Sequence, residues 1–382
     1  MNNNIHIKVS CEVLVWARES LALTRNQVTE KTDISANRLI QLETGERQPT
    51  IEELKTFSKT YKRTIATLLL HKPPREKPLP SDRRTLDSKG RGNFHEKTIM
   101  AVRKARALAQ SYVELREEMD IEIPGFKLAA SIHDNPKEIG SRIRQLMSLH
   151  ELREITNINY ALEGYIEKVE SLGIVVFQLS LTQDNLRGFS IVDDIVPIIG
   201  IKRGGEQSHS KTFTLFHELG HILLNEGGLC DLSHKTQVEI EKWCNSFAAE
   251  ILIPTAELFR QGKVNEYQRK GNPIWAKNDL IQLANYFHVG PLAILRSLFE
   301  NGLTSKVFYK EKHELWNKPQ FGRAKNLEGR NIAKEAVQEK GKNFVGLAFK
   351  AFDQNRINTK DLSDFLGVRL SYITKTRQLL NA

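Results

Sequence analysis

The sequence predicts a multidomain protein with a small all-α domain at the N-terminus, a larger α+β domain and a helical C-terminal region. A segment rich in proline and charge, HKPPREKPLPSDRR, separates the first helical patterns from the rest of the chain. Short amphipathic helical patterns precede this segment, and three apolar, β-branched segments flanked by helical patterns follow it. We therefore expect domains over residues 1–72, 93–305 and 306–382, with a linker over residues 73–92.

Composition and charge limit the function classes. The 382 residues are 40% hydrophobic and 27% charged, as in a folded globular chain. The chain has no apolar run long enough for a membrane span, no secretory pattern at its start and no paired spacing of its three cysteines, so we expect a cytoplasmic protein with no membrane partner. Residues 1–90 carry 16 Lys and Arg against 11 Asp and Glu, and residues 302–382 carry 16 against 8. These basic ends could meet an anionic partner, although solvated lysine-rich faces would carry the same charge.

The N-terminal domain is predicted to be a series of short helices. The first segment, CEVLVWARESLAL, repeats its apolar residues at a helical period. Thr24 is a suitable N-cap for the next helix, RNQVTEKT, and DIS forms a tight turn. Two further helices are expected over ANRLIQLE and IEELKTFSKTYK.

This region resembles the XRE family of Cro/repressor-type helix-turn-helix domains. The motif I-x-x-x-E-x-G-x-x-x-P-T is matched by Glu43, Gly45, Pro49 and Thr50. Thr29 and Asp33 depart from the pattern, because they stand where Ala and Gly are usual.

The resemblance implies double-stranded DNA as a partner, because the third helix of such folds enters the major groove. Asn37, Arg38 and Gln41 lie early on that helix and are expected to contact bases, since Arg can pair with guanine and Asn or Gln with adenine. Gln27 is expected to contact a phosphate. A homodimer is possible, and a dimerisation module without DNA binding is the alternative interpretation.

The larger domain is expected to begin with helices and continue with strands. Long helical patterns cover FHEKTIMAVRKARALAQSYVELREEM, NPKEIGSRIRQLMSL and NINYALEGYIEKVESLG, and strands are predicted over IVVFQLS, FSIVDD and IVPIIGIK. Helices follow around HELGH, over QVEIEKWCNSFAAEIL and over DLIQLANYFHVGPLAILRSLFENGL. Residues 305–322 are predicted to be irregular and basic, and the chain ends in helices.

The segment TFTLFHELGHILLN places two imidazoles and a carboxylate inside an apolar helix. Burial of such groups without partners would cost several kcal/mol. His217 and His221 are four residues apart, so both can reach one metal ion from the same helix face. In the H-E-x-x-H pattern Glu218 is the general base toward the attacking water. Gly220 has no side chain, so another element can pack closely behind the ligands.

A catalytic zinc needs a third protein ligand. The extended pattern H-E-x-x-H-x-x-G-x-x-H is excluded, because the chain has Leu224 and Gly227 at the two further positions. In the following helix Glu241 shares a face with the small Ala248, which favours it as the third ligand. Cys244 is the alternative as a thiolate, although a small buried hydrophobe is the simpler interpretation of this residue.

Together, FTLFHELGHILL and EKWCNSFAAEILIP resemble the ImmA/IrrE family of bacterial zinc peptidases. Its second motif, E-x-x-A-N-x-F-A-x-x-L-x-P, is matched at Glu241, Asn245, Phe247 and Ala248, and Leu252 and Pro254 each follow one residue after the last two fixed positions. Cys244 stands where Ala is usual. The resemblance implies a zincin-like fold of the gluzincin type, Zn²⁺ held by His217, His221 and Glu241, and Glu218 as the catalytic base.

We therefore expect a DNA-binding transcriptional regulator with zinc-dependent endopeptidase activity toward a repressor or antitoxin protein. One alternative is a DNA-binding regulator whose metal site is structural or vestigial. A second is an antitoxin-like protein that sequesters its partner without proteolysis. The basic C-terminal region could add a phosphate-binding surface or pack around the peptidase domain.

Overall fold

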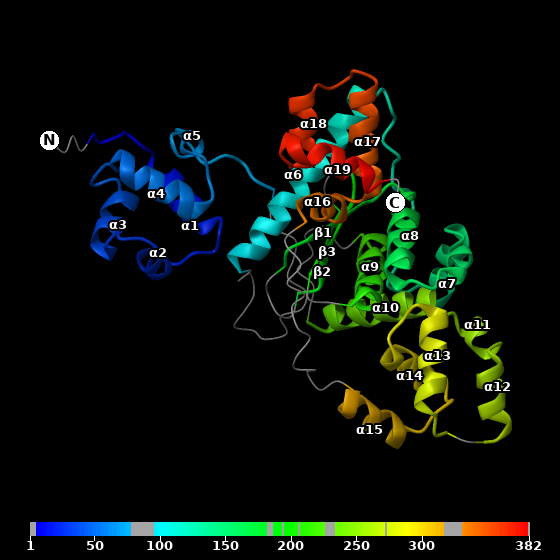
Figure 1. The fold of residues 1–382 in the computed structure, drawn as a ribbon. Coiled ribbons are helices and arrows are strands. Elements are labelled where there is room, and N and C mark those ends of the chain that lie inside the picture. The colour runs from blue at the N-terminus through cyan, green and yellow to red at the C-terminus, as the bar shows by residue number, and fades with distance from the viewer. Residues whose placement is uncertain are drawn as a thin grey trace. The chain divides into compact units, whose positions relative to one another are not determined.

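The computed structural model describes residues 5–77, 95–181, 186–192, 195–204, 207–225, 234–271, 273–316 and 331–380. The chain forms two compact units, Met1–Arg103 and Lys104–Ala382 (Figure 1). Most of the predicted linker lies outside the described residues. No helix in the described ranges is long and apolar enough to cross a membrane.

The first unit is helical, as predicted. Its short helices are α1 (Cys11–Glu19), α2 (Arg25–Lys31), α3 (Ala36–Glu43), α4 (Ile51–Tyr61) and α5 (Ile65–Leu68). Thr24 and Thr50 each accept a hydrogen bond from the backbone of the third helical residue, whose side chain accepts one from the capping residue in return. These capping boxes satisfy backbone donors at the starts of α2 and α4. The expected N-cap at Thr24 is therefore confirmed.

The first unit also contains a buried charge cluster centred on Glu43, one of the residues of the helix-turn-helix motif. The Glu43 side chain is fully buried, and its two carboxylate oxygens accept hydrogen bonds from Arg18 Nε at 2.6 Å and Arg25 Nε at 2.7 Å. Arg18 also donates to the Leu23 carbonyl at 2.9 Å. The cluster thus connects α1, α2 and α3, which explains why a carboxylate occupies this position of the motif.

Glu43→Ala should destabilise the first unit by about 3 kcal/mol, because loss of one partner leaves a buried guanidinium without its carboxylate. Differential scanning calorimetry of the full chain should show a lower transition temperature for this unit. Glu19→Ala is the matched control, since Glu19 is exposed and pairs with the same Arg18. Its effect should stay below about 1 kcal/mol. Equal shifts in the two variants would contradict the structural role of Glu43.

The second unit combines helices with a three-stranded sheet. The long helix α6 (Glu96–Glu118) leads into it, and the helices before the sheet are α7 (Pro136–Leu146), the 3₁₀ helix η1 (Leu149–Glu154) and α8 (Ile158–Glu170). The strands are β1 (Val175–Leu179), β2 (Gly188–Ile191) and β3 (Ile198–Lys202). β1 and β3 lie within the predicted segments, and β2 begins one residue before its predicted segment. The order is β1-β3-β2, with β1 parallel and β2 antiparallel to β3, so β2 is an edge strand of the sheet as described.

Two helices after the sheet carry the candidate metal ligands. These are α9 (Ser208–Leu223) and α10 (His234–Leu252). Helix α9 packs on β2, β3 and α8, and α10 packs between α9 and α7. A Cβ atom on Gly220 of α9 would lie 3.1 Å from Cys244 Sγ, and one on Gly140 of α7 would lie 3.1 Å from the Phe247 carbonyl oxygen. The expected close packing behind Gly220 is therefore confirmed, and α10 also approaches a glycine on its other side.

The remaining helices complete the second unit. They are α11 (Thr255–Phe259), α12 (Gly262–Arg269), α13 (Lys277–Phe287), α14 (Pro291–Glu300), α15 (Lys306–Trp316), α16 (Ile332–Lys340), α17 (Lys342–Asp353), α18 (Thr359–Leu366), the 3₁₀ helix η2 (Leu370–Tyr372) and α19 (Ile373–Gln378). The prediction of irregular structure over residues 305–322 was wrong for α15. Phe308 of α15 is buried, and Tyr309 stacks on Phe299 of α14, so apolar contacts hold this basic segment as a helix.

The C-terminal helices pack on the sheet region. Helix α16 contacts β1, and Glu339 of α16 lies 3.3 Å from Arg203, which follows β3. Asn343 of α17 donates a hydrogen bond of 2.6 Å to Glu170 at the end of α8. The C-terminal helices therefore belong to the same compact unit as the metal-ligand helices.

Candidate functional site

Helix α9 presents His217 and His221 on one face. Both residues are buried, with exposed fractions of 5% and 3%. Their Nε2 atoms lie 3.2 Å apart. Four-residue spacing on one helix explains this approach, because it places the two imidazoles one turn apart on the same side.

Glu241 of α10 faces both histidines. Its Oε2 lies 3.3 Å from His217 Nε2, and its Oε1 lies 3.3 Å from His221 Nε2. Burial alone would raise the pKa of the Glu241 carboxyl, but the contacts with the two histidines outweigh it and lower the pKa well below its usual range. Oε1 is buried and accepts no hydrogen bond from the described residues. The three side chains form a cluster that could hold a metal ion.

The donor atoms of the three residues lie close enough together to share one metal ion. Zinc bonds of 2.0–2.1 Å at tetrahedral angles place neighbouring ligand atoms about 3.3–3.4 Å apart. The two imidazole Nε2 atoms lie 3.2 Å apart, and each lies 3.3 Å from a different carboxylate oxygen of Glu241. One ligand atom from each residue lies within 4.8 Å of the other two. A metal ion would also satisfy the buried Oε1 atom of Glu241. Two neutral imidazoles and a carboxylate are a donor set that zinc accepts in catalytic sites.

Asn245 supports the cluster, although sequence reasoning gave it no role. Its Oδ1 lies 3.1 Å from His217 Nδ1 and accepts a hydrogen bond when that nitrogen is protonated. That tautomer leaves Nε2 of His217 as the atom available to a metal. Phe213, one turn before His217, stacks against the same ring. The signal was present in the sequence, since Asn245 follows Glu241 by four residues and therefore shares its helix face.

Asn245→Ala should weaken metal binding about 10- to 100-fold while leaving the three ligands in place, because the partner that orients His217 is lost. Competition with a chromophoric chelator would measure the dissociation constant. Asn245→Asp keeps an acceptor at the same place and should retain tight binding. Ser246→Ala, at the neighbouring position, is the matched control. An unchanged dissociation constant in Asn245→Ala would contradict the orienting role.

The other acidic and thiol side chains of the region have different environments. Glu218 is buried, and a Cβ atom on Gly188 of β2 would lie 3.2 Å from Glu218 Cγ, so Glu218 lies against the edge strand. Cys244 is fully buried behind Gly220 and is not part of the cluster. Glu239 is exposed, and Glu250 accepts hydrogen bonds from the backbone and hydroxyl of Thr255. The thiol alternative for the third ligand therefore has no support in this geometry.

In the first unit, the residues predicted to contact DNA differ in their environments. Asn37 is exposed and Gln41 is half-buried, both on α3. Gln27 is exposed on α2, and its side-chain oxygen accepts a hydrogen bond of 2.9 Å from the Thr24 backbone. Arg38 instead donates two hydrogen bonds, of 2.7 and 2.8 Å, to the Glu53 carboxylate and a third to the Gln48 carbonyl. Arg38 thus connects α3 to α4.

Comparisons with known proteins agree with both resemblances found in the sequence. Residues 14–68 match a helix-turn-helix family model, and residues 169–299 match a peptidase family model described as the IrrE N-terminal-like domain. Searches of curated proteins and of solved structures found no match. The first domain implies DNA binding, and the second implies a protein substrate. The chain therefore combines an XRE-type helix-turn-helix domain at its N-terminus with an IrrE N-terminal-like domain of the metallopeptidase type, which contains the cluster of His217, His221 and Glu241.

Proposed function

We propose that the protein is a DNA-binding regulator with zinc-dependent endopeptidase activity toward a repressor or antitoxin protein. The observation that carries the proposal is the cluster of His217, His221 and Glu241, together with the buried Glu218, which follows His217 in the sequence and lies against β2. A purely structural metal site would need the ligands but no adjacent carboxylate.

The proposed chemistry assigns a role to each side chain. His217, His221 and Glu241 hold the zinc ion. When bound, zinc supplies a Lewis acid that polarises a peptide carbonyl and acidifies a water molecule. Glu218 accepts the proton from the attacking water and delivers it to the leaving amine. Asn245 keeps His217 in the tautomer that leaves Nε2 available to the metal.

The edge strand β2 supports a mode of substrate binding. Its residues pair with β3 on one side, and Gly188 lies against Glu218. An extended peptide could add to β2 through main-chain hydrogen bonds, which would bring its backbone beside the general base. The substrate would then be recognised mainly in an unfolded or extended segment.

A substrate trap tests the peptidase proposal. Glu218→Gln keeps the three ligands and removes the base, so this variant should retain an intact partner that the wild-type chain cleaves. Affinity purification of both forms from cells, followed by mass spectrometry, would identify the partner and its fragments. Capture of the same uncut partner by both forms would instead indicate sequestration without proteolysis.

For the DNA-binding half, we assign base contacts to Asn37 and Gln41, and a phosphate contact to Gln27. Arg38 would act indirectly, because its ion pair with Glu53 holds α3 against α4. Selection from a random duplex library with the full chain should enrich a pseudo-palindromic site with half-sites about one helical turn apart, as expected for a dimer.

Asn37→Ala should relax specificity at one position of each half-site, at a cost of about 1–3 kcal/mol for the preferred base. Binding assays on matched duplexes that differ only at that position would measure the cost. Gln27→Ala should instead weaken all sequences about equally and reduce the salt dependence. If no duplex is enriched by the wild-type chain, the dimerisation interpretation of this domain remains.

A further inference from the structure

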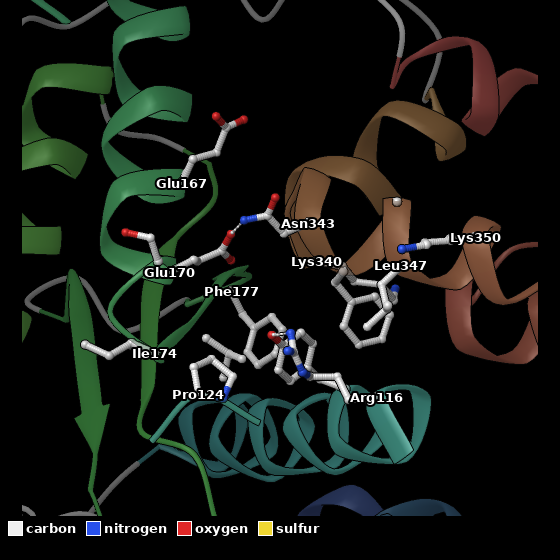
Figure 2. Close-up of a pocket in the computed structure, with 15 residues that line it drawn as sticks. Arg116, Pro124, Glu167, Glu170, Ile174, Phe177, Lys340, Asn343, Leu347 and Lys350 are labelled. Carbon is white, nitrogen blue, oxygen red and sulfur yellow. Dashed lines mark hydrogen bonds between the residues drawn. The ribbon is translucent and has the colours of Figure 1, made fainter. Parts of the chain in front are cut away.

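A cavity lies in the second unit, between the C-terminal half of α6, the end of α8 with β1, and the helices α16 and α17 (Figure 2). Its volume is about 400 Å³, which is within the usual range of small-molecule sites. None of the three candidate metal ligands lines it. The cavity is therefore separate from the candidate peptidase site.

A carboxyl group and an amide join the two sides of this cavity. Glu170 of α8 accepts a hydrogen bond of 2.6 Å from Asn343 of α17, drawn as a dashed line in Figure 2. Burial raises the pKa of Glu170 to about 8 despite this hydrogen bond. Burial therefore opposes the charged form of Glu170 and weakens it as a counter-ion for the cations that share the cavity.

The buried cation of the cavity, Lys340, has a weak ion pair. Lys340 lines the cavity with an exposed fraction of only 4%, and its Nζ lies 3.4 Å from Glu339 Oε1, a long distance for an ion pair. The same Glu339 carboxylate also lies 2.7 Å from Lys104 Nζ and 3.3 Å from Arg203 Nη1. One carboxylate thus serves three cations. A buried ammonium group in this position would gain from a bound anion.

Two further cations border the same space. Lys350 of α17 is exposed and lines the cavity. Arg116 of α6 also lines it, where its guanidinium donates to the Tyr112 hydroxyl at 2.9 Å and to the Glu122 carbonyl. Glu167 is the other acidic residue among the lining side chains, and it is exposed. The described lining is therefore net positive.

The rest of the lining is apolar. Phe177 and Phe344 are almost fully buried, and Leu347 of α17 completes this side. Apolar walls with a few convergent charges are typical of sites for small molecules rather than for proteins. We propose that this cavity is a binding site for a small organic anion, with its carboxylate, sulfonate or phosphate group near Lys340 and Lys350 and its apolar body against Phe177 and Phe344.

A matched pair of fluorescent probes tests the site on the full chain. 8-Anilinonaphthalene-1-sulfonate carries an anionic group on an aromatic body, and N-phenyl-1-naphthylamine has the same body without charge. The anionic probe should bind saturably, with one site per chain and higher affinity than the neutral probe. Lys340→Met keeps the volume of the side chain and removes its charge, so it should reduce the preference for the anionic probe by several-fold.

Blocking the cavity gives an independent readout. A Cβ atom on Gly346, which lines the cavity, would meet no atom within 4 Å, so a larger side chain has room to enter the space. Gly346→Phe should abolish saturable binding, and the milder Gly346→Leu should weaken it. Gly262→Phe in α12 is the control, because a Cβ atom there also meets nothing and lies outside the cavity. Circular dichroism would verify that the variants are folded. Unchanged binding in folded Gly346→Leu, or equal affinity of the two probes in the wild type, would overturn the proposal.

Discussion

Glu241→Ala is expected to reduce the metal content of the purified protein from about one ion per chain to a small fraction. The two histidines of α9 would remain, but they supply only two of the three protein ligands that a catalytic zinc site uses. The lost carboxylate is also the group that the second helix contributes, so both nitrogens would lose their charged partner. Elemental analysis of protein prepared without chelators is the direct measurement.

Glu239→Ala is the matched control for this experiment. Glu239 lies on the same helix, two residues before the proposed ligand, and is exposed. This variant should keep full metal content. Stoichiometric metal in Glu241→Ala would instead require a different third ligand, and a further substitution at Cys244 would then decide whether α10 rearranges to present its thiol.

Glu218→Gln should keep one metal ion per chain and lower the rate of peptide cleavage by about 10²- to 10⁴-fold, the usual contribution of a positioned general base. The amide has nearly the shape of the carboxylate but cannot accept the proton of the attacking water. The measurement requires the partner captured by the substrate trap, with metal content determined on the same preparation.

Glu218→Asp distinguishes a base from a structural carboxylate. Asp keeps the negative charge on a side chain that is shorter by one methylene group. The rate of peptide cleavage by this variant should therefore fall between those of the wild type and Glu218→Gln. A loss of metal in Glu218→Gln would contradict the separation of base and ligands. Full proteolysis in that variant would exclude Glu218 as the base.

Much of the fold and the arrangement of the candidate site could be predicted, because both depend on local periodicity. The four-residue spacing of His217 and His221 and the helical phase of Glu241 are properties of single helices. The structure needed only to pack those helices together, and the glycine between the histidines was a signal for that packing. Their function as ligands stays a prediction until metal is measured.

Features that depend on distant partners could not be predicted in this way. The guanidinium of Arg38 is a group that can pair with guanine, but here it forms an ion pair with Glu53 of the next helix. The helical state of α15 depends on aromatic contacts with α14. The cavity lined by Lys340 and Phe177 combines side chains from α6, α8 and α17, which only tertiary packing brings together. Local sequence patterns do not predict these contacts, because the contacting residues are on different helices.

The position of α10 between Gly140 and Gly220 has a thermodynamic consequence for the metal. Contacts of Cys244 and Phe247 with these glycines set the separation of α9 and α10, so the spacing of the ligands is determined by helix packing. Small zinc domains, by contrast, obtain their folding free energy from the ion and unfold without it. Here the second unit would fold without the ion, and metal binding would add to its stability according to the concentration of free metal. The ion could then be removed and replaced reversibly, because α9 and α10 would hold the ligands in place without it.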